Sequence, residues 1–375
     1  MFYEPEGTGG RVNLSVLPFR LSESVSATAN VAPTRTLSNY FLGTQLGSAL
    51  ANPTLSPTKV HMKIGYNEHY SLSIQRKISS KDVFEVAYVG NHGVHLGGNN
   101  DFNDPEPGPS TTIVNGVTVV KSIQQRRPYQ PFGTINFNTS DLSTNYNSLQ
   151  SKFEHRAGNG LTATAAYTYS KFFQFNQAPA LGGNTGYEYA LSPSDIPHNL
   201  ALSATYALPF GHGKHYLGGI NTLTNTLIGG WKLQTIVVLR SGTPFTPTVS
   251  SDVANTGVGG QRPNLNPAGG NPNFTRTVTS WFDKTKYVFA PIYNYGQVHA
   301  NTLRSDISRQ YDASIFKNFS LPGESTLSFR AEFFNLPNTT SFAAPNSTVD
   351  ASAAGQITNA TSAPRDIQFA LKYNF

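Results

Sequence analysis

Two histidine pairs in the sequence have the spacing of metal ligands. His92 and His95 are separated by two residues, and so are His212 and His215. Imidazole nitrogens at this spacing can bind a transition metal. Neither pair has a third ligand nearby, and both lie where we expect a loop or a turn. The sequence therefore favours solvated loop histidines over a metal site.

Scattered carboxylates are the second candidate for chemistry, because two of them held together could catalyse hydrolysis as general acid and base. The candidates are Asp195, Asp252, Asp306 and Asp312, and nothing in the sequence brings them together. The zinc-protease motif His-Glu-x-x-His, the phosphate-binding loop and the Gly-x-Ser-x-Gly nucleophile elbow are absent. We therefore expect no catalytic site and no cofactor.

Four charged residues stand inside regularly alternating segments rather than in loops. They are Lys152, Glu154, Arg330 and Glu332. Charges in such positions can line a substrate path, but they more often pair with one another or with another part of the protein. For Arg330 and Glu332 we favour the pairing role over a substrate path.

The last eleven residues alternate between apolar and mostly polar side chains. The apolar positions are Ile367, Phe369, Leu371, Tyr373 and Phe375. A period of two predicts a strand with one apolar face. A chain terminus usually frays into water, whereas the last strand of an outer-membrane barrel places every second side chain in lipid. The pattern is therefore typical of such a barrel.

The composition fits a membrane protein that spans the bilayer with strands. Charged residues make up 13% of the 375 residues, against roughly 25% in a soluble domain, and aromatic residues reach 12%. No run of about 18 apolar residues exists, which excludes a transmembrane helix. Cysteine is absent, so the sequence offers no disulfide and no thiolate metal site. The net charge of +6 is scattered, and we expect no nucleic-acid partner.

Nine segments alternate well enough to predict strands. They cover residues 67–78, 82–91, 145–156, 161–173, 199–208, 229–241, 310–319, 324–336 and 365–375. Most exceed the five or six residues typical of soluble sheets and match strands tilted about 45° across a bilayer. A tenth strand near 11–17 is weaker, and residues 18–66 have the composition of a long loop.

The connections between these strands alternate in length. Three are short turns, namely 79–81, 158–160 and 320–323, and the connection 209–228 is intermediate. The long connections are 92–144, 174–198, 242–309 and 337–364. Outer-membrane barrels have tight periplasmic turns and long extracellular loops. A periplasmic C-terminus would put all the long loops outside the cell.

The alternation also predicts which side chains face the lumen. An unpaired charge aimed at mid-bilayer lipid costs about 2–4 kcal/mol. Arg330 and Glu332 lie opposite the apolar residues of their segment, and Lys152 and Glu154 lie opposite those of theirs. We therefore expect all four charges to face the lumen.

Several segments, taken in order, resemble the C-terminal barrel portion of Oar-like TonB-dependent outer-membrane receptors, of the type abundant in acidobacteria. The matching segments are 70–77, 85–90, 126–129, 146–150, 160–171, 229–233, 241–245, 329–336 and 364–368. Each is weak by itself, but their order and spacing are specific together. The resemblance implies an all-β, antiparallel transmembrane barrel of which this chain holds the C-terminal strands, about ten of 22.

The resemblance also implies the protein's surroundings. Receptors of this family have an N-terminal plug, a TonB box and often a carboxypeptidase-regulatory-like domain, and none of these is expected within residues 1–375. No signal peptide opens the sequence at Met1, so we expect the C-terminal part of a longer protein in the outer membrane of a Gram-negative cell. Its implied partners are outer-membrane lipid, the TonB complex through the missing N-terminal region, and an unknown bulky solute.

Two further roles are expected of particular residues. The C-terminal strand ending in Phe375 resembles the signal by which the barrel-assembly machinery recognises its clients. In the long loops, Tyr129, Trp281, Tyr287 and Tyr293 could stack on a sugar, a peptide or a chelate.

Two alternatives remain open. The chain could be a complete ten-stranded barrel, acting as a passive porin or an enzyme, since an even number of strands lets both termini be periplasmic. It could also be a secreted, soluble β-sandwich that binds carbohydrate, although the long strands disfavour this.

Overall fold

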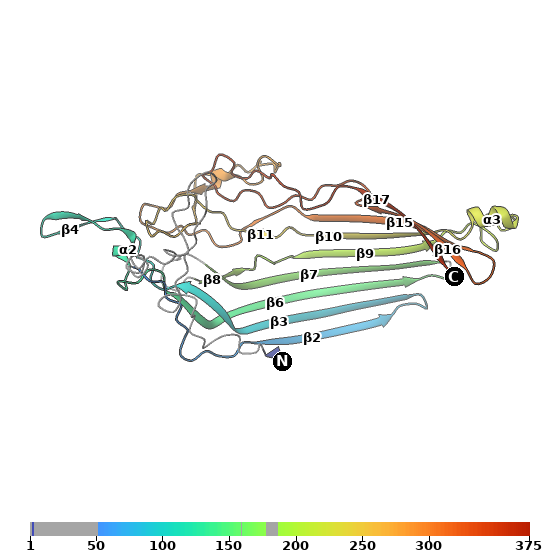
Figure 1. Ribbon diagram of the computed structural model, residues 1–375, viewed down its shortest axis with the longest axis horizontal. Coiled ribbons are helices and arrows are strands. Elements are labelled where there is room, and N and C mark those ends of the chain that lie inside the picture. The colour runs from blue at the N-terminus through green and yellow to red at the C-terminus, as the bar shows by residue number, and fades with distance from the viewer. Residues whose placement is uncertain (1, 4–51, 159, 178–186) are drawn as a thin grey trace, which may run out of the picture.

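One antiparallel sheet dominates the computed structural model, which describes residues 2–3, 52–158, 160–177 and 187–375 (Figure 1). Each strand pairs with its neighbour in the order β1-β2-β3-β6-β7-β9-β10-β15-β16-β17, and β8 pairs with β7. The strands are β1 (Phe2–Tyr3), β2 (Tyr66–Lys77), β3 (Asp82–Asp101), β6 (Asn136–Arg156), β7 (Leu161–Gln177), β8 (Tyr187–Leu191), β9 (His198–Ala207), β10 (Lys232–Arg240), β15 (Ser308–Ser320), β16 (Thr326–Phe334) and β17 (Asp366–Asn374).

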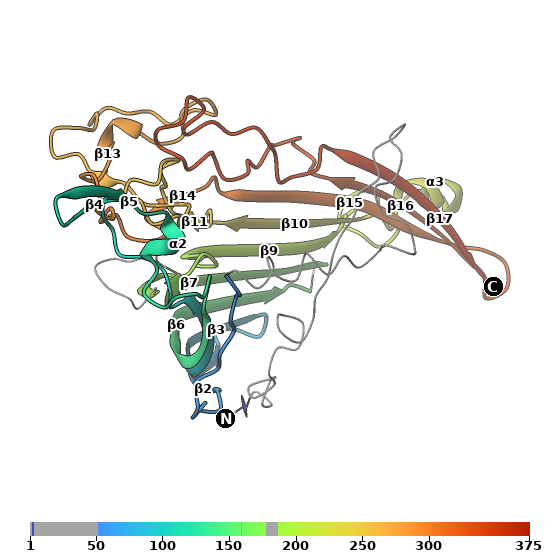
Figure 2. The ribbon, with the colours of Figure 1, turned by 60° about the vertical axis from the view of Figure 1, so that its left-hand side comes forward.

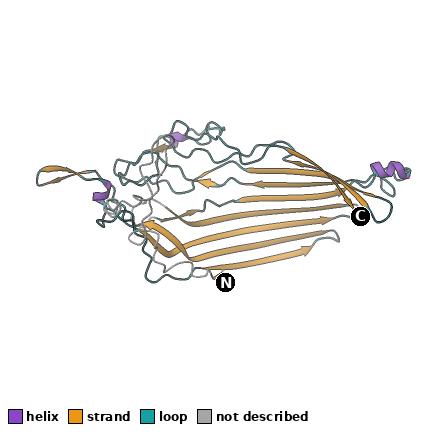
Figure 3. Cartoon of the chain, viewed as in Figure 1, coloured by secondary structure: helices purple, strands orange, loops and turns teal. Residues whose placement is uncertain are grey.

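Short helices and strands lie at both ends of this sheet, and the long strands run between them (Figure 3). They are β4 (Thr111–Val114), β5 (Val117–Val120), α2 (Ile123–Arg126), α3 (Thr222–Ile228), β11 (Pro244–Phe245), β12 (Asn264–Leu265), η1 (Lys284–Lys286), β13 (Tyr287–Val288) and β14 (Leu303–Arg304). β4 and β5 form a hairpin around Asn115 and Gly116, which both have positive φ, as an Asn-Gly turn requires. No helix in the described ranges is both long and apolar enough to cross a membrane.

All nine predicted strands are confirmed, as β2, β3, β6, β7, β9, β10, β15, β16 and β17. The predicted loop 92–144 is wrong at both ends, because β3 continues to Asp101 and β6 begins at Asn136. These extensions are mostly polar and carry only scattered apolar residues, such as Leu96 and Phe137, so no regular alternation marks them. The weak strand near 11–17 and most of the loop 18–66 lie outside the described residues.

The alternation of short and long connections is confirmed. The turns 78–81 and 321–325 lie at one end of the strands, where β6 also ends and β7 begins, together with α3 and the C-terminus (Figure 1). We call this end the turn rim. The opposite end, the loop rim, carries β4, α2, β8 and the long connection between β10 and β15. The chain is thus an up-and-down meander in which each pair of neighbouring strands is joined at alternating rims.

The register gives the sheet one apolar face and one polar face. On β16 and β17, Leu327 pairs with Tyr373 and Phe329 with Leu371, while Glu332 pairs with Gln368 on the other face. The apolar side chains are open to their surroundings: Leu371 is 67% exposed. A large exposed apolar surface of this kind needs a non-aqueous neighbour.

The sheet is an open wall rather than a closed barrel within the described residues. β17 pairs only with β16, and β2 pairs on its outer side only with the two residues of β1. Figure 2 shows the wall curving from β2 to β17. Because nine long strands alternate in direction, β2 and β17 run the same way. An odd number of additional strands is therefore needed to close this wall with antiparallel pairs throughout.

Candidate functional site

The connections at the loop rim fold into one packed unit, which we call the rim lobe (Figure 2). It comprises residues 102–135, 187–197, 241–307 and 335–365. Its core contains Val249, Phe282 and Val349, with Phe245, Val253, Tyr287 and Leu303 packed around them. The strand pairs β11–β14 and β12–β13 add short ladders. Segments far apart in the sequence therefore form a defined surface above the wall.

Glu188 joins two parts of the rim lobe. Its carboxylate is 8% exposed and forms an ion pair with the guanidinium of Arg262, which is 5% exposed. It also contacts Nδ1 of His299 and accepts a hydrogen bond of 3.1 Å from the backbone N–H of Ala300. Burial acts to raise the pKa of Glu188, but these donors prevail and lower it. The charged carboxylate thus fastens β8 to residues 262–300.

Asp195 fastens the lobe to the wall in a similar way. It is fully buried, forms an ion pair with Arg304 and accepts a hydrogen bond of 2.7 Å from the backbone N–H of Phe172 on β7. Arg304 also donates to the carbonyls of Asp195 and Gly242, at 3.0 and 3.1 Å. The surroundings of Asp195 are therefore those of a structural ion pair.

The other scattered carboxylates have separate partners as well. Asp252 accepts hydrogen bonds from the backbone N–H groups of Thr256 and Gly257. Asp306 pairs with Arg309 at 2.7 Å, and Asp312 accepts a hydrogen bond from the N–H of Asn335. The structure thus does not join the four aspartates into a catalytic pair.

A buried asparagine shapes the loop between β3 and β6. The Asn103 side chain donates to the carbonyls of Tyr129, Phe132 and Gly133 at 2.7–3.1 Å and accepts the N–H of Tyr129 at 2.7 Å. The ring of Tyr129 is stacked on that of Phe102, with centroids 5.6 Å apart. These rings are 48% and 43% exposed, so the lobe presents a fixed aromatic platform to solvent.

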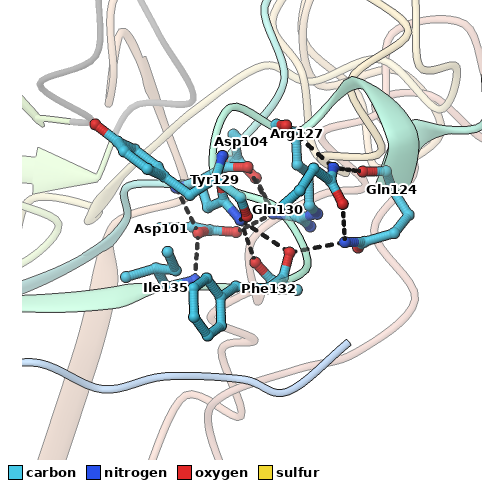
Figure 4. A network of polar contacts seen from close by, with 10 residues as sticks. Asp101, Asp104, Gln124, Arg127, Tyr129, Gln130, Phe132 and Ile135 are labelled. Atoms are coloured by element: carbon cyan, nitrogen blue, oxygen red, sulfur yellow. Dashed lines mark hydrogen bonds and ion pairs between the residues drawn. The ribbon is translucent and has the colours of Figure 1, made fainter. Parts of the chain in front are cut away.

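Two carboxyl groups and one arginine lie beside this platform. Arg127 contacts Asp101 at 3.0 Å and Asp104 at 3.7 Å (Figure 4). Burial, together with the hydrogen bond and the charge of Asp101, raises the pKa of Asp104 to about 7. The cluster therefore holds a proton on Asp104 at mildly acidic pH.

This proton makes the stability of the loop depend on pH. Asp104 has an ordinary pKa of 3.8 when unfolded and about 7 when folded, so its contribution is complete below the first value and is lost as the pH rises through the second. The side chain is 33% exposed, and after allowing for solvent screening we expect about 1–2 kcal/mol. Limited proteolysis of residues 102–135 should be faster at about pH 8 than at about pH 5. Asp104→Asn should remove this difference, whereas Glu106→Gln, at an exposed neighbour, should keep it. An Asp104→Asn variant that is still cleaved faster at about pH 8 than at about pH 5 would contradict the assignment.

The four aromatic residues expected to contact a ligand divide into two groups. Tyr129 and Tyr293 are 48% and 41% exposed. Trp281 instead donates its indole N–H to the carbonyl of Arg304 at 2.7 Å, and Tyr287 packs edge-on against Phe282. The latter two residues hold the lobe together. Phe102 is a further exposed aromatic residue that could not be predicted from the sequence, because it follows a polar strand end with no alternating pattern around it.

The four charges predicted to face the lumen form two separate pairs on the polar face of the sheet. Lys152 lies 2.6 Å from Glu154 on β6, and Arg330 lies 3.3 Å from Glu332 on β16. Arg330 also lies over the ring of Phe316, 5.3 Å from its centroid. The structure thus pairs these charges within each strand, and their position in a lumen stays a prediction.

The C-terminal residues lie along the free edge of the sheet. Ile367, Phe369, Leu371 and Tyr373 are 47–68% exposed, and Phe375 is 99% exposed. The ring of Phe369 stacks on that of Phe329, and the ring of Tyr373 on that of Phe375. The strand prediction is confirmed, while the role in assembly stays a prediction.

The first histidine pair lies in a strand, so its predicted loop position is wrong. His92 and His95 belong to β3, where His95 has a positive φ and packs edge-on against Tyr66. His212 and His215 lie in the connection between β9 and β10, as expected. Among the described residues, no three His, Asp or Glu side chains are placed to hold a metal ion.

The chain is similar to proteins of the bacterial outer membrane. A solved structure of the outer membrane transporter YddB from Escherichia coli has a TM-score of 0.41 and 13% identity, over 86% of this chain and 34% of that one. The chain therefore spans about a third of the length of that transporter chain. No protein among those with curated functions matches the sequence. The family model described as "Outer membrane beta barrel domain" matches residues 1–368. This match makes the soluble β-sandwich alternative wrong. The chain belongs to the outer membrane β-barrel domain family and resides in the outer membrane.

Proposed function

We propose that this chain is the C-terminal part of the barrel of a TonB-dependent receptor that takes up a bulky solute. The observation that carries the proposal is the rim lobe, in which residues 241–307 and 335–365 share one core and the neighbouring loop 102–135 presents Phe102 and Tyr129 on a fixed platform. A pore for small solutes needs no such surface, whereas a receptor must bind its ligand before transport. Aromatic rings stack well on sugars, peptides and aromatic chelates.

The open wall supports the proposal that another part of the protein completes the barrel. Within the part of the chain that the structure describes, the outer edges of β2 and β17 leave most of their backbone N–H and C=O groups without partners, and each such group costs several kcal/mol in hydrocarbon. Additional barrel strands would satisfy them. We propose that these strands, an energised plug and the contact with the TonB complex come from a preceding region, and that the chain itself is not an enzyme.

Energy dependence of uptake tests this function. Cells that carry the whole gene should accumulate one member of a panel of labelled oligosaccharides, peptides and ferric chelates, and a protonophore should abolish the accumulation. A matched variant, Tyr129→Ala, should weaken uptake while leaving the amount of folded protein unchanged. Uptake that persists after the protonophore would contradict TonB dependence.

One observation favours the small complete barrel as a second candidate. β1 pairs antiparallel with β2, so it runs in the direction that a closing strand between β2 and β17 requires. A ten-stranded barrel would give energy-independent leakage of small solutes, and the isolated chain would show heat-modifiable gel migration after refolding in detergent. Both results together would favour this candidate.

We also propose that the C-terminal strand is recognised by the barrel-assembly machinery. Phe375→Asp should lower the amount of folded protein in outer-membrane fractions severalfold, because it removes the terminal aromatic of the apolar face. Asn374→Asp, which places the same charge on the opposite face, should have little effect. Unchanged levels of the Phe375 variant would argue against recognition.

A further inference from the structure

The short helix α3 lies against the apolar face of the sheet at the turn rim. Asn221 caps it by accepting the N–H of Thr224 at 2.8 Å, and it ends at Gly229, whose N–H binds the carbonyl of Asn225. The indole N–H of Trp231 donates to the carbonyl of Leu227 at 2.8 Å. Trp231 in turn packs edge-on against Phe329 of β16, with ring centroids 6.0 Å apart. The end of the helix is thus fixed to the wall.

A buried lysine provides the second attachment. Lys317 shares a face of the sheet with Phe319 and pairs in register with Phe329, so it stands among the apolar residues. It is only 4% exposed, and its ammonium group donates to the carbonyl of Thr226. The same group lies over the rings of Trp231 and Phe319, at 5.7 and 4.9 Å. The helix and Trp231 therefore separate this cation from whatever surrounds the apolar face.

The outer side of α3 is apolar and uncovered. Leu223 is 77% exposed, Leu227 64% and Ile228 40%. In water this arrangement would be unfavourable, because removing a leucine side chain from water lowers the free energy by about 1.5–3 kcal/mol. Some apolar medium or partner must therefore meet this side of the helix.

The position of α3 identifies that medium. Lys317, Phe329 and Leu371 form one row across β15, β16 and β17, and the next row toward the turn rim, Phe319, Leu327 and Tyr373, is again apolar. The helix is therefore attached within the apolar band and not beyond its edge. In a membrane barrel the apolar face meets lipid, and a short amphipathic helix is stable where acyl chains meet headgroups.

We infer that α3 is an interfacial anchor, whose residues Leu223, Leu227 and Ile228 insert into the lipid leaflet at the turn rim and whose inner side covers Lys317. The anchor fixes the depth of the barrel in the bilayer at the point where a charged side chain would otherwise face acyl chains. This inference rests on membership of the barrel family and is independent of any transported solute.

Site-directed fluorescence tests the anchor. The sequence contains no cysteine, so cysteine at position 223, 227 or 214 is a unique labelling site in this chain. The full-length protein carries bimane on Leu223→Cys, Leu227→Cys or the exposed control Lys214→Cys. It is reconstituted in phosphatidylethanolamine and phosphatidylglycerol vesicles with nitroxide lipids. Heat-modifiable gel migration verifies that each labelled protein is folded.

Lipid contact predicts blue-shifted emission at positions 223 and 227, with stronger quenching by nitroxide near the headgroup than by nitroxide deep in the acyl chain. Position 214 should show neither effect. Emission at 223 and 227 equal to that at 214 would place the helix in water and overturn the inference. Blue-shifted emission without nitroxide quenching would show that a second copy or another protein covers the helix, and would overturn it equally.

Discussion

Replacing Arg262 by alanine is expected to open the rim lobe while the barrel strands stay folded. The substitution leaves the carboxylate of Glu188, which is 8% exposed, without its buried ionic partner. Removing one member of a buried ion pair typically costs about 3–5 kcal/mol, because the remaining charge cannot regain water. His299 cannot compensate fully, since its side chain is 72% exposed and screened by solvent.

Hydrogen exchange measures this effect. Amides of β8 and of residues 297–301 should lose protection in Arg262→Ala, whereas those of β9 and β10 should keep it. Arg276→Ala is the matched control, because Arg276 is exposed and only lies over the ring of Trp281. Adding Glu188→Gln to the Arg262 variant should restore part of the protection. Parent-like protection in Arg262→Ala would show that the ion pair does not hold the lobe.

The strands could be predicted from the sequence because their two faces have different environments, one apolar and one polar. Alternate residues of β16 and β17, such as Phe369 and Gln368, lie on faces with opposite requirements, so their types alternate. Beyond the membrane this constraint ends. The outer parts of β3 and β6 pair polar residues, such as Asn99 with Asn138, and their sequence could not be told from that of a loop.

The rim lobe could not be predicted, because its contacts join residues of distant segments. Asp195 and Arg304 are 109 positions apart, and Glu188 and His299 are 111 apart. No local pattern marks such partners. The sequence therefore offers Asp195 as a possible catalytic group, and only its complete burial beside Arg304 shows its structural role.

The aromatic residues of the loops show the same limit. Tyr129 and Tyr287 both lie in long connections where no regular alternation indicates which side chain is buried. In the structure Tyr129 is held at the surface by the hydrogen bond of its N–H to Asn103, while Tyr287 packs in the core of the lobe. Exposure, and with it the capacity to bind a ligand, follows from tertiary contacts.

An arginine at Leu202 is expected to destabilise the barrel far more than an arginine at the next residue. Leu202 lies near the centre of β9 and pairs with Ala165 and Val237 on the apolar face, while Ser203 pairs with Thr164 and Ile236 on the polar face. A charge on the lipid side at the middle of the bilayer costs about 2–4 kcal/mol, whereas the same charge in a polar lumen is solvated. The two substitutions match in strand, depth and introduced side chain, so apart from the residue that is removed they differ only in the face that receives the charge.

Unfolding by guanidinium in lipid vesicles, followed through tryptophan fluorescence and gel migration, measures both variants. Leu202→Arg should lower the unfolding midpoint strongly and reduce the folded fraction in outer membranes, while Ser203→Arg should stay close to the parent. Equal losses would mean that both faces meet the same environment, which a wall between lipid and lumen does not allow. A larger loss at Ser203 would reverse the assignment of the faces, and Lys152, Glu154, Arg330 and Glu332 would then face lipid, at a cost that no folded barrel could sustain without further partners.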